Sequence, residues 1–110
     1  MGATKTEIFN GEQNQLAVML KAIAHPARIA ILQRIIQANA CICGDLVDEL
    51  GLAQSTISQH LKELKNAGLI KGNIEGASTC YCINPPVWNK LQSHLIDLFM
   101  SYKPVKETCC

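Results

Sequence analysis

Closely spaced cysteines are the most chemically distinctive feature of this 110-residue sequence. In an extended backbone, residues two positions apart point to the same side, so the sulfurs of Cys41 and Cys43 can reach one soft ion. Thiolates prefer thiophilic ions such as arsenite, antimonite, cadmium, lead or Cu(I). In a reducing compartment this spacing indicates metal binding or redox sensing rather than a disulfide scaffold. The alternative is that both cysteines pack as small apolar side chains in a segment that connects two helices.

A trivalent arsenic site would need one more sulfur. Arsenic in this state binds three sulfurs in a pyramid, and Cys41 with Cys43 supplies two. The candidates for the third, from the same or a second subunit, are Cys80, Cys82, Cys109 and Cys110. The first two alternate to one face of a predicted strand, where small half-buried residues ordinarily pack. The last two lie on a tail, where they could capture a metalloid, form a disulfide or do nothing.

The predicted helix that starts near Gln54 carries side chains suited to a second kind of chemistry. Ile57, Leu61 and Leu64 recur at helical spacing and are expected to face a core. The residues expected to point outward and contact DNA are Gln54, Ser55, Thr56, Ser58, Gln59, His60, Lys62 and Lys65. Glutamine can bond an adenine edge, serine and threonine can bond bases or phosphates, and lysine neutralises phosphates. The polar face of a helix is also often only solvated, so spacing alone leaves the role open.

A short helix and a tight turn must position this face. A helix over 45–50 is predicted to end at Gly51, whose freedom at positive φ allows a sharp turn. Helix, glycine turn and polar second helix make the helix-turn-helix plan. Strand-like runs over 69–74 and 79–84 then predict a hairpin. Beside a helix-turn-helix such a hairpin is a wing, here with Lys71 as its one basic residue.

Apolar stripes predict three more helices around this unit. The first starts at Glu12, and the second runs from Pro26 to about Gln37, with Arg28 expected in a surface or interhelical ion pair. After Pro85-Pro86 a near-heptad stripe predicts a last helix, along Trp88, Leu91, Leu95, Leu98, Phe99 and Tyr102. Because a small monomer would not leave this stripe open, we expect it to pair with the first helix across a twofold axis.

Two segments, AHPARIAIL at 24–32 and LGLAQSTISQHLKELKNAGLI at 50–70, closely resemble the ArsR/SmtB family of winged-helix bacterial repressors. The likeness runs from about Leu16 to about Tyr102, nearly the whole chain. It implies a mainly α fold with a small β-hairpin, a winged helix-turn-helix of about five helices plus a two-stranded wing. It also implies a homodimer, joined through terminal helices, that binds double-stranded operator DNA with half-sites about 10 base pairs apart.

The resemblance extends only in part to the cysteines. In the family's arsenic-sensing branch, a Cys-x-Cys-Asp-Leu-Cys run ligates trivalent arsenic or antimony. Here Gly44 separates Cys43 from Asp45-Leu46, and Val47 takes the place of the third cysteine. The resemblance therefore implies Cys41 and Cys43 as metal ligands and leaves the third open.

Histidines could complete a metal site elsewhere, but the sequence argues against it. The family's other common site lies on the last helix, and the run from His94 to Asp97 resembles its second half. The first half is missing, because Tyr81 and Ile83 stand at the matching positions and cannot ligate zinc. We therefore expect His94 at a dimer interface or on the surface, and His25 in a structural turn.

Length and composition fit one domain, since 48% apolar and 17% charged residues exclude a disordered chain. We expect a flexible arm over 1–11, a DNA-binding and dimerisation domain over 12–102, and a flexible cysteine-containing tail over 103–110. The net charge of +1 predicts modest non-specific DNA binding. With no signal-like segment and no apolar run of about 18 residues, we expect a cytoplasmic protein without membrane contact.

These features favour a metalloid-responsive repressor that arsenite or antimonite releases from its operator by binding the cysteine thiolates. No cofactor is expected to be required for folding. Two alternatives keep the fold: a repressor that responds to thiol redox or persulfide chemistry, and a sensor of soft metals such as cadmium or lead. A third is a metal-buffering or protein-interaction module without DNA binding. An enzyme is not expected, because no Gly-rich phosphate loop, Ser/His/Asp set or carboxylate pair stands out.

Overall fold

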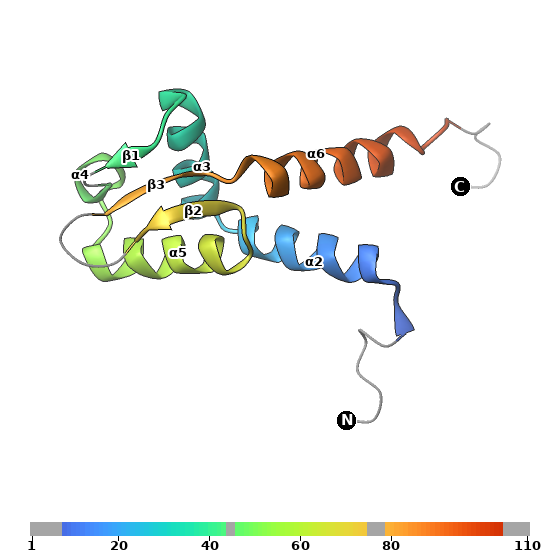
Figure 1. The fold of residues 1–110 in the computed structure, drawn as a ribbon, viewed down its shortest axis with the longest axis horizontal. Helices are drawn as coiled ribbons and strands as arrows, with labels where there is room; N and C mark the ends of the chain where they lie inside the picture. The colour runs from blue at the N-terminus through green and yellow to red at the C-terminus, as the bar shows by residue number, and fades with distance from the viewer. Residues whose placement is uncertain (1–7, 44–45, 75–78, 105–110) are drawn as a thin grey trace.

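The computed structural model describes residues 8–43, 46–74 and 79–104, in which helices surround a small sheet (Figure 1). In chain order the elements are α2 (Gly11–Ile23), α3 (Pro26–Ala38), β1 (Ile42–Cys43), α4 (Val47–Leu50), α5 (Gln54–Asn66), β2 (Ile70–Asn73), β3 (Cys80–Ile83) and α6 (Pro85–Met100). The pair α4 and α5 with the β2–β3 hairpin gives the expected helix-turn-helix and wing. Most of the predicted arm and tail lie outside the described residues.

Local sequence sets where the first two helices begin and end. Asn10 caps α2, because its Oδ1 accepts a hydrogen bond from the Gln13 backbone N–H at 2.7 Å while Gln13 Oε1 accepts from the Asn10 N–H at 3.1 Å. His25 caps α3 by accepting from the Ala27 N–H at 3.0 Å, with a proline in the first turn. This confirms the structural role predicted for His25. Asn39, at φ 53°, ends α3 in the left-handed conformation.

The strands form one antiparallel sheet in the order β1-β3-β2. On one side of β3, Ile42 pairs with Tyr81 and Cys43 pairs with Cys80. On the other side the wing strand β2 pairs with β3. The prediction of a two-stranded wing is therefore incomplete, because the connection before the helix-turn-helix adds β1 as a third strand of the sheet. Two residues carry no periodicity of their own, so β1 forms only because β3 offers an edge for pairing.

Gly72 lets β2 approach β3 closely. Its φ is +123°, a conformation that residues with a side chain rarely adopt. A β-carbon at this position would collide with the carbonyl oxygen of Cys80 and lie 2.9 Å from the Cα of Tyr81. Only glycine therefore fits the centre of the wing.

The core lies between the sheet and the helices that cover it. Its buried apolar members are Met19, Ala22, Ile31, Leu32, Ile35, Leu46, Ile57, Leu61, Leu64, Leu69, Ile70, Ile74, Tyr81 and Leu91. Ile57, Leu61 and Leu64 are at most 3% exposed, which confirms the inward face predicted for α5.

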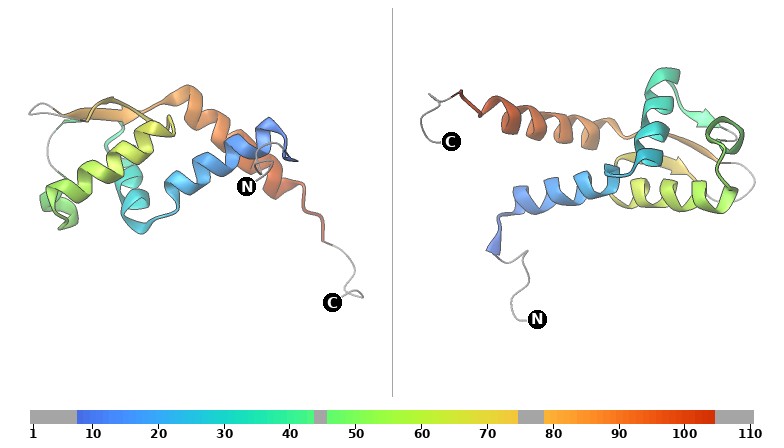
Figure 2. Two further views of the ribbon diagram at one scale, coloured as in Figure 1. Left: turned by 90° about the horizontal axis from the view of Figure 1, so that it is seen from below. Right: turned by 180° about the vertical axis from the view of Figure 1, so that it is seen from behind.

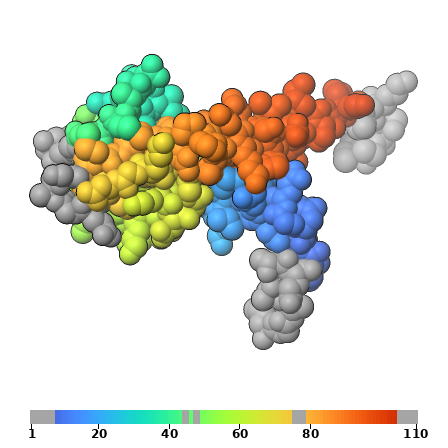
Figure 3. Space-filling model, in the orientation of Figure 1, coloured from blue at the N-terminus to red at the C-terminus, as the bar shows by residue number. Residues whose placement is uncertain are grey.

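The terminal helices α2 and α6 contact each other and project from the body that holds the sheet (Figures 1 and 2), as the space-filling view also shows (Figure 3). Leu91 is buried, but the outer part of the predicted stripe is open to solvent in one chain. Of the predicted stripe, Leu98, Phe99 and Tyr102 are exposed, and Ile96 and Met100 are further exposed apolar residues of α6. Among the described residues no single helix has the length and hydropathy to cross a membrane; α2 and α3 reach them only together, across a 91° bend.

Candidate DNA-binding face and cysteine cluster

The outer face of α5 presents most of the predicted DNA-contacting residues. The exposed ones are Gln54, Ser55, Thr56, Gln59, Lys62 and Lys65. Ser58 is half-buried and hydrogen-bonded to Gln54, whose Nε2 lies 3.2 Å from the serine Oγ. Gly51, at φ +69°, makes the turn that leads into α5. We call the six exposed residues the α5 face: Gln54, Ser55, Thr56, Gln59, Lys62 and Lys65.

A groove of about 460 Å³ lies between the outer side of α5 and the wing. It is lined by Gln54, Ser55, Ser58, Gln59 and Lys62 of α5 and by Ile74 and Thr79 of the wing. Lys71 on β2 is a further exposed cation, while Glu63 on α5 opposes the lysines. The result is a polar, weakly basic surface whose groups can bond base edges and phosphates.

His60 does not lie on this surface. It is 8% exposed, because its position between Ile57 and Leu61 turns it toward the inside of the molecule. Arg28 Nε donates to His60 Nδ1 at 3.1 Å, and the centroids of the His25 and His60 rings are 4.4 Å apart. The prediction that His60 points outward is therefore wrong.

Arg28 and His60, with His25 beside them, form a polar junction between α3 and α5. Arg28 Nη1 also donates to the Ala22 carbonyl oxygen at 3.1 Å, so the arginine joins the helices through neutral partners and not through the expected ion pair. Burial lowers the pKa of His60, and His25 and Arg28 lower it further. A neutral His60 ring suits this contact, because Nδ1 must be unprotonated to accept the hydrogen bond from the Arg28 Nε–H.

The two cysteines of β3 face Cys43 of β1 and Cys41 just before β1, and we call these two pairs the cysteine ladder. In the inner pair, Cys43 and Cys80 are register partners joined by a disulfide, with Cα atoms 4.1 Å apart. In the outer pair, Cys41 stands one position earlier and shares a side-chain hydrogen bond with Cys82. Both pairs lie on the solvent side of the sheet, because the alternate residue Tyr81 is buried.

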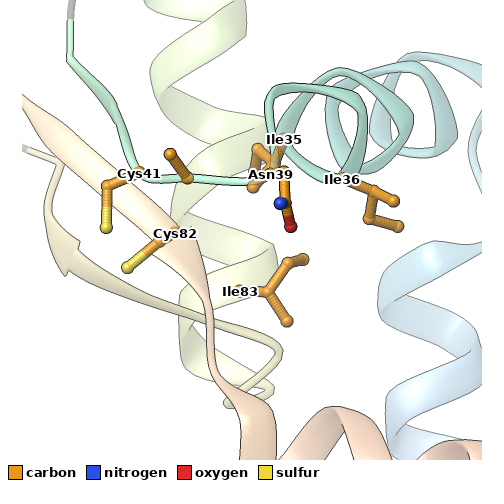
Figure 4. A pocket seen from close by; sticks show the side chains of 7 residues that line it. Ile35, Ile36, Asn39, Cys41, Cys82 and Ile83 are labelled. Atoms are coloured by element: carbon orange, nitrogen blue, oxygen red, sulfur yellow. The ribbon is translucent and has the colours of Figure 1, made fainter.

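The outer pair consists of free thiols, of which Cys41 is exposed and Cys82 half-buried (Figure 4). The hydrogen bond with Cys82 raises the pKa of Cys41, and desolvation and the nearby Cys82 charge raise it further, while Lys71 acts in the opposite direction. Lys71 stands opposite Cys82 on β2. One row of the sheet therefore holds two thiols and an ammonium group.

The ladder does not offer three thiolates in this form. Cys43 and Cys80 are bonded to each other, which leaves two free thiols in the described part of the chain. Among those residues, no group of three or more His, Cys, Asp or Glu is placed to hold a metal ion. Cys109 and Cys110 lie outside the described residues.

The ordinary packing role expected for Cys80 is wrong, since it bonds to β1, and sequence reasoning missed this pairing. The signal was the repeated Cys-x-Cys spacing, which places two thiols on one side of each strand. What the sequence could not supply was the register that sets Cys43 against Cys80.

His94 lies where α6 meets α2. Its Nδ1 is 2.9 Å from Glu12 Oε1, and its side chain is 16% exposed. The other ring nitrogen, Nε2, is buried and has no hydrogen-bond partner among the described residues. At the positions where the family's zinc site would begin, Tyr81 is buried in the core and Ile83 packs against it. His94 therefore ties two helices of one chain together.

Comparison with known proteins agrees with this architecture. Residues 25–71, from α3 to the start of the wing, match the family described as bacterial regulatory protein, arsR family. The transcriptional repressor SmtB of Mycobacterium tuberculosis is 41% identical over 63 residues, which cover 57% of this chain and 46% of that repressor. The chain thus spans less than half the length of that relative.

Two further comparisons extend over nearly the whole chain. HlyU from Vibrio cholerae N16961 superposes with a TM-score of 0.63 at 28% identity, covering 84% of this chain and 99% of HlyU. The transcriptional regulator YgaV of Escherichia coli (strain K12) is 31% identical over 96 residues, which cover 87% of this chain and 97% of YgaV. Since the family match and these likenesses share the winged helix-turn-helix described above, the chain belongs to the arsR family of bacterial regulatory proteins.

Proposed function

We propose that this chain is a homodimeric transcriptional repressor that binds double-stranded operator DNA through α5 and the wing. A thiophilic effector releases it by reacting with the cysteine ladder. The observation that carries the proposal is the place of the ladder, because the chain runs from β1 toward α4 while β3 is a strand of the wing. One cluster of cysteines therefore joins β3 of the wing to β1, the strand that precedes α4 in the chain.

The DNA side of the proposal is supported by the α5 face and its groove. The helix presents an amide, hydroxyls and ammonium groups while its apolar residues are buried, so it can enter a major groove without exposing its core. Lys62 and Lys65 on α5 and Lys71 on β2 can neutralise phosphates on either side. Membership of a family of bacterial regulatory proteins points the same way.

Dimerisation is supported by the open apolar surface of α6. Leu98 and Phe99 are each more than half exposed on a helix that projects from the body (Figure 3), and Tyr102, just beyond the end of that helix, is also more than half exposed. A second copy that covers this surface with its own α2 and α6 would remove it from water. The same pairing would hold two α5 helices at a fixed separation, as a near-palindromic operator requires.

Arsenite first and antimonite second are the proposed effectors. In a reducing cytoplasm all four ladder cysteines would be thiols, so Cys41 and Cys43 could complete a three-sulfur site with Cys80 or Cys82. An ion that pulls these strands together would shift α4 and the wing relative to α5. Allosteric coupling of this kind is typically about 1–3 kcal/mol, or roughly 5–150-fold in DNA affinity.

Thiol redox chemistry is the second candidate, and the disulfide between Cys43 and Cys80 favours it. Closing or opening this bond, or bridging it with sulfane sulfur, would alter the same strands without a metal. Cadmium or lead would instead use up to four thiolates of the reduced ladder.

A selection from random duplexes tests the DNA side. Reduced protein is used to enrich the duplexes it prefers, and its affinity for selected and random DNA is then measured by fluorescence anisotropy at several salt concentrations. We expect a preference of about 10³-fold or more and an affinity that falls steeply with salt. Equal affinity for both kinds of duplex contradicts the proposal. Titrating the complex with arsenite, cadmium or hydrogen peroxide separates the effector classes.

A further inference from the structure

A hollow of about 440 Å³, which we call the junction hollow, lies where the end of α2, the start of α3 and the end of α5 come together. Figure 1 shows α2 joining the body beside this end of α5. The polar lining residues are Lys21, Arg28, Glu63 and Asn66, and the apolar ones are Val18, Ala22 and Ala67. None of them belongs to the cysteine ladder or to the α5 face, so the hollow is a separate surface.

Arg28 brings a positive charge to this hollow without a carboxylate partner. The residue is half-buried, and its Nε and Nη1 donate to His60 Nδ1 and to the Ala22 carbonyl oxygen, each at 3.1 Å. Two of the five guanidinium N–H groups thus bond neutral acceptors. Within the described residues no ion pair includes Arg28 or Lys21. An anion in the hollow would supply the missing countercharge.

The other donors of this side suit a carboxylate. The three N–H groups of Arg28 outside its two contacts are on Nη1 and Nη2, the nitrogens that can hold both oxygens of a carboxylate in an end-on pair. Lys21 adds an exposed ammonium group and Asn66 an exposed amide. A carboxylate at Arg28 would therefore find a second cation and a further hydrogen-bond donor in the same hollow.

Glu63 gives the hollow a negative side. It is half-buried on α5, and its Oε2 accepts a hydrogen bond from Gln59 Nε2 at 3.1 Å. A dianion such as phosphate would be repelled by this carboxylate, whereas a ligand with its own ammonium group would pair with it. Val18 and Ala67 add apolar surface that can contact a short apolar side chain.

We infer that the junction hollow binds a small zwitterion, an α-amino acid with an apolar side chain. Its carboxylate pairs with Arg28 and Lys21, its ammonium group pairs with Glu63, and its side chain packs against Val18 and Ala67. The bound molecule would link α3 to α5 next to the contact between Arg28 and His60. As a binding site the inference stands alone, and as a control of DNA binding it rests on the proposed function.

Binding is tested on the full-length protein by nuclear magnetic resonance titration with L-leucine. Leucinamide lacks the carboxylate and 4-methylpentanoate lacks the ammonium group. Each should bind about 10-fold more weakly than leucine or worse, because a charged hydrogen-bonded pair is lost. Inorganic phosphate should also bind more weakly. Equal binding of leucine and 4-methylpentanoate, or tighter binding of phosphate, overturns the inference.

The ring of His60 reports on the carboxylate. Burial lowers the pKa of His60, and His25 and Arg28 lower it further. A carboxylate paired with Arg28 should therefore raise this pKa toward its ordinary value, and leucinamide should not. Titration of the ring resonances with and without saturating leucine measures the change. A His60 pKa that leucine leaves unchanged overturns the placement of the carboxylate at Arg28.

Two variants remove charges of the hollow and leave the contact between Arg28 and His60 in place. Glu63→Gln should weaken leucine binding by about 10-fold. Lys21→Ala should weaken it by about 2–5-fold, because an exposed pair contributes less. Lys90→Ala, an exposed lysine of α6 outside the hollow, is the matched control and should bind leucine as the wild type does. Wild-type affinity in both Glu63→Gln and Lys21→Ala overturns the inference.

These measurements are made without DNA, so a negative result leaves the proposed repressor standing. Operator affinity is then measured with and without saturating leucine, and we expect it to change, because the ligand links α5 to α3. Leucine that binds as expected but leaves operator affinity unchanged would contradict control of DNA binding through the hollow, while the binding site itself would stand.

Discussion

The α5 face and the cysteine ladder are two candidate functional surfaces of the molecule, and they are built differently. On α5, exposed residues are bonded locally at most, as Gln59 is to Glu63 one turn further along at 3.1 Å. In the ladder, each of the four cysteines is bonded or hydrogen-bonded to the cysteine across from it. The α5 side chains can therefore rearrange toward a partner molecule, whereas a change at the ladder must move two strands together. In the proposed function, DNA contact and its control would therefore use separate surfaces.

Contacts within the fold connect these two surfaces. Arg34 on α3 pairs with Glu49 on α4 at 2.7 Å, although both side chains are more than a third exposed and the pair adds little stability. Asn84, just after β3, donates from Nδ2 to the Gly68 carbonyl at 2.9 Å and so fixes the end of the wing to the end of α5. A displacement of β1 or β3 would therefore move the residues that adjoin both ends of α5.

The largest expected effect comes from separating the two α5 faces of a dimer. Leu98→Glu with Phe99→Glu places charges on the exposed apolar part of α6 and should give a monomer. Operator affinity should then fall by about 10²–10⁴-fold, because each half-site is bound independently, while the disulfide within each chain still forms. Analytical ultracentrifugation and anisotropy measure the two properties, with Lys90→Glu as the exposed control on α6. A dimer that persists in the double variant contradicts the role of this surface.

Gly72→Ala should affect both surfaces at once, because Gly72 sits where β2 meets the cysteine strand. Positive φ and the collision with the Cys80 carbonyl should lower the free energy of unfolding by about 3 kcal/mol. Urea denaturation measures this. At Gly11 a β-carbon would meet nothing within 4 Å, so Gly11→Ala is the matched control and should be neutral or slightly stabilising. Equal denaturation midpoints for the two variants would refute the argument.

Substitutions on α5 should alter DNA contact without altering thiol chemistry. Gln59→Ala should weaken operator binding by about 1–3 kcal/mol and relax the preference at one base pair. Lys62→Ala should weaken binding to all sequences and reduce the slope of log affinity against log salt by about one per subunit. Thiol reactivity toward arsenite should match that of the wild type. A salt slope unchanged by Lys62→Ala would place this lysine away from the phosphates.

The smallest expected effect concerns pH and the polar junction. Folding lowers the pKa of His60 from 6.5. Well above pH 6.5 the His60 ring is therefore neutral in both the folded and the unfolded chain, and the free energy of unfolding does not depend on this group. As the pH falls below 6.5, the unfolded chain binds the proton first, so the free energy of unfolding decreases until the folded ring also titrates. His60→Asn, which keeps an acceptor for Arg28 but cannot titrate, should flatten this decline in urea denaturation at mildly acid pH. An identical decline in the variant would assign the effect to another group.

The parts of the fold that repeat with a period could be predicted, and the parts made by pairing could not. Ile57, Leu61 and Leu64 follow the helical period, so the buried side of α5 was evident from the sequence. His60 has the same spacing, but its polar side chain suggests the outer face, and the compensating Arg28 lies 32 residues away. Tertiary hydrogen bonding therefore overrode side-chain type.

The cysteine site shows the same limit. The spacing of Cys41 and Cys43 predicts two thiols on one side of an extended segment, and the structure agrees. Their partners depend on strand register, because a shift of one residue would turn Cys80 and Cys82 toward the core. The two-residue strand that fixes this register has no local signal.

Release of operator DNA by arsenite tests the central claim most directly. Fully reduced wild-type protein and the Cys41→Ser with Cys43→Ser variant are each bound to the same fluorescent operator, and affinity is measured with and without arsenite. The account predicts equal starting affinities, a loss of about 5–150-fold for the wild type on adding arsenite, and no loss for the variant. A variant that arsenite releases as completely as the wild type would contradict it.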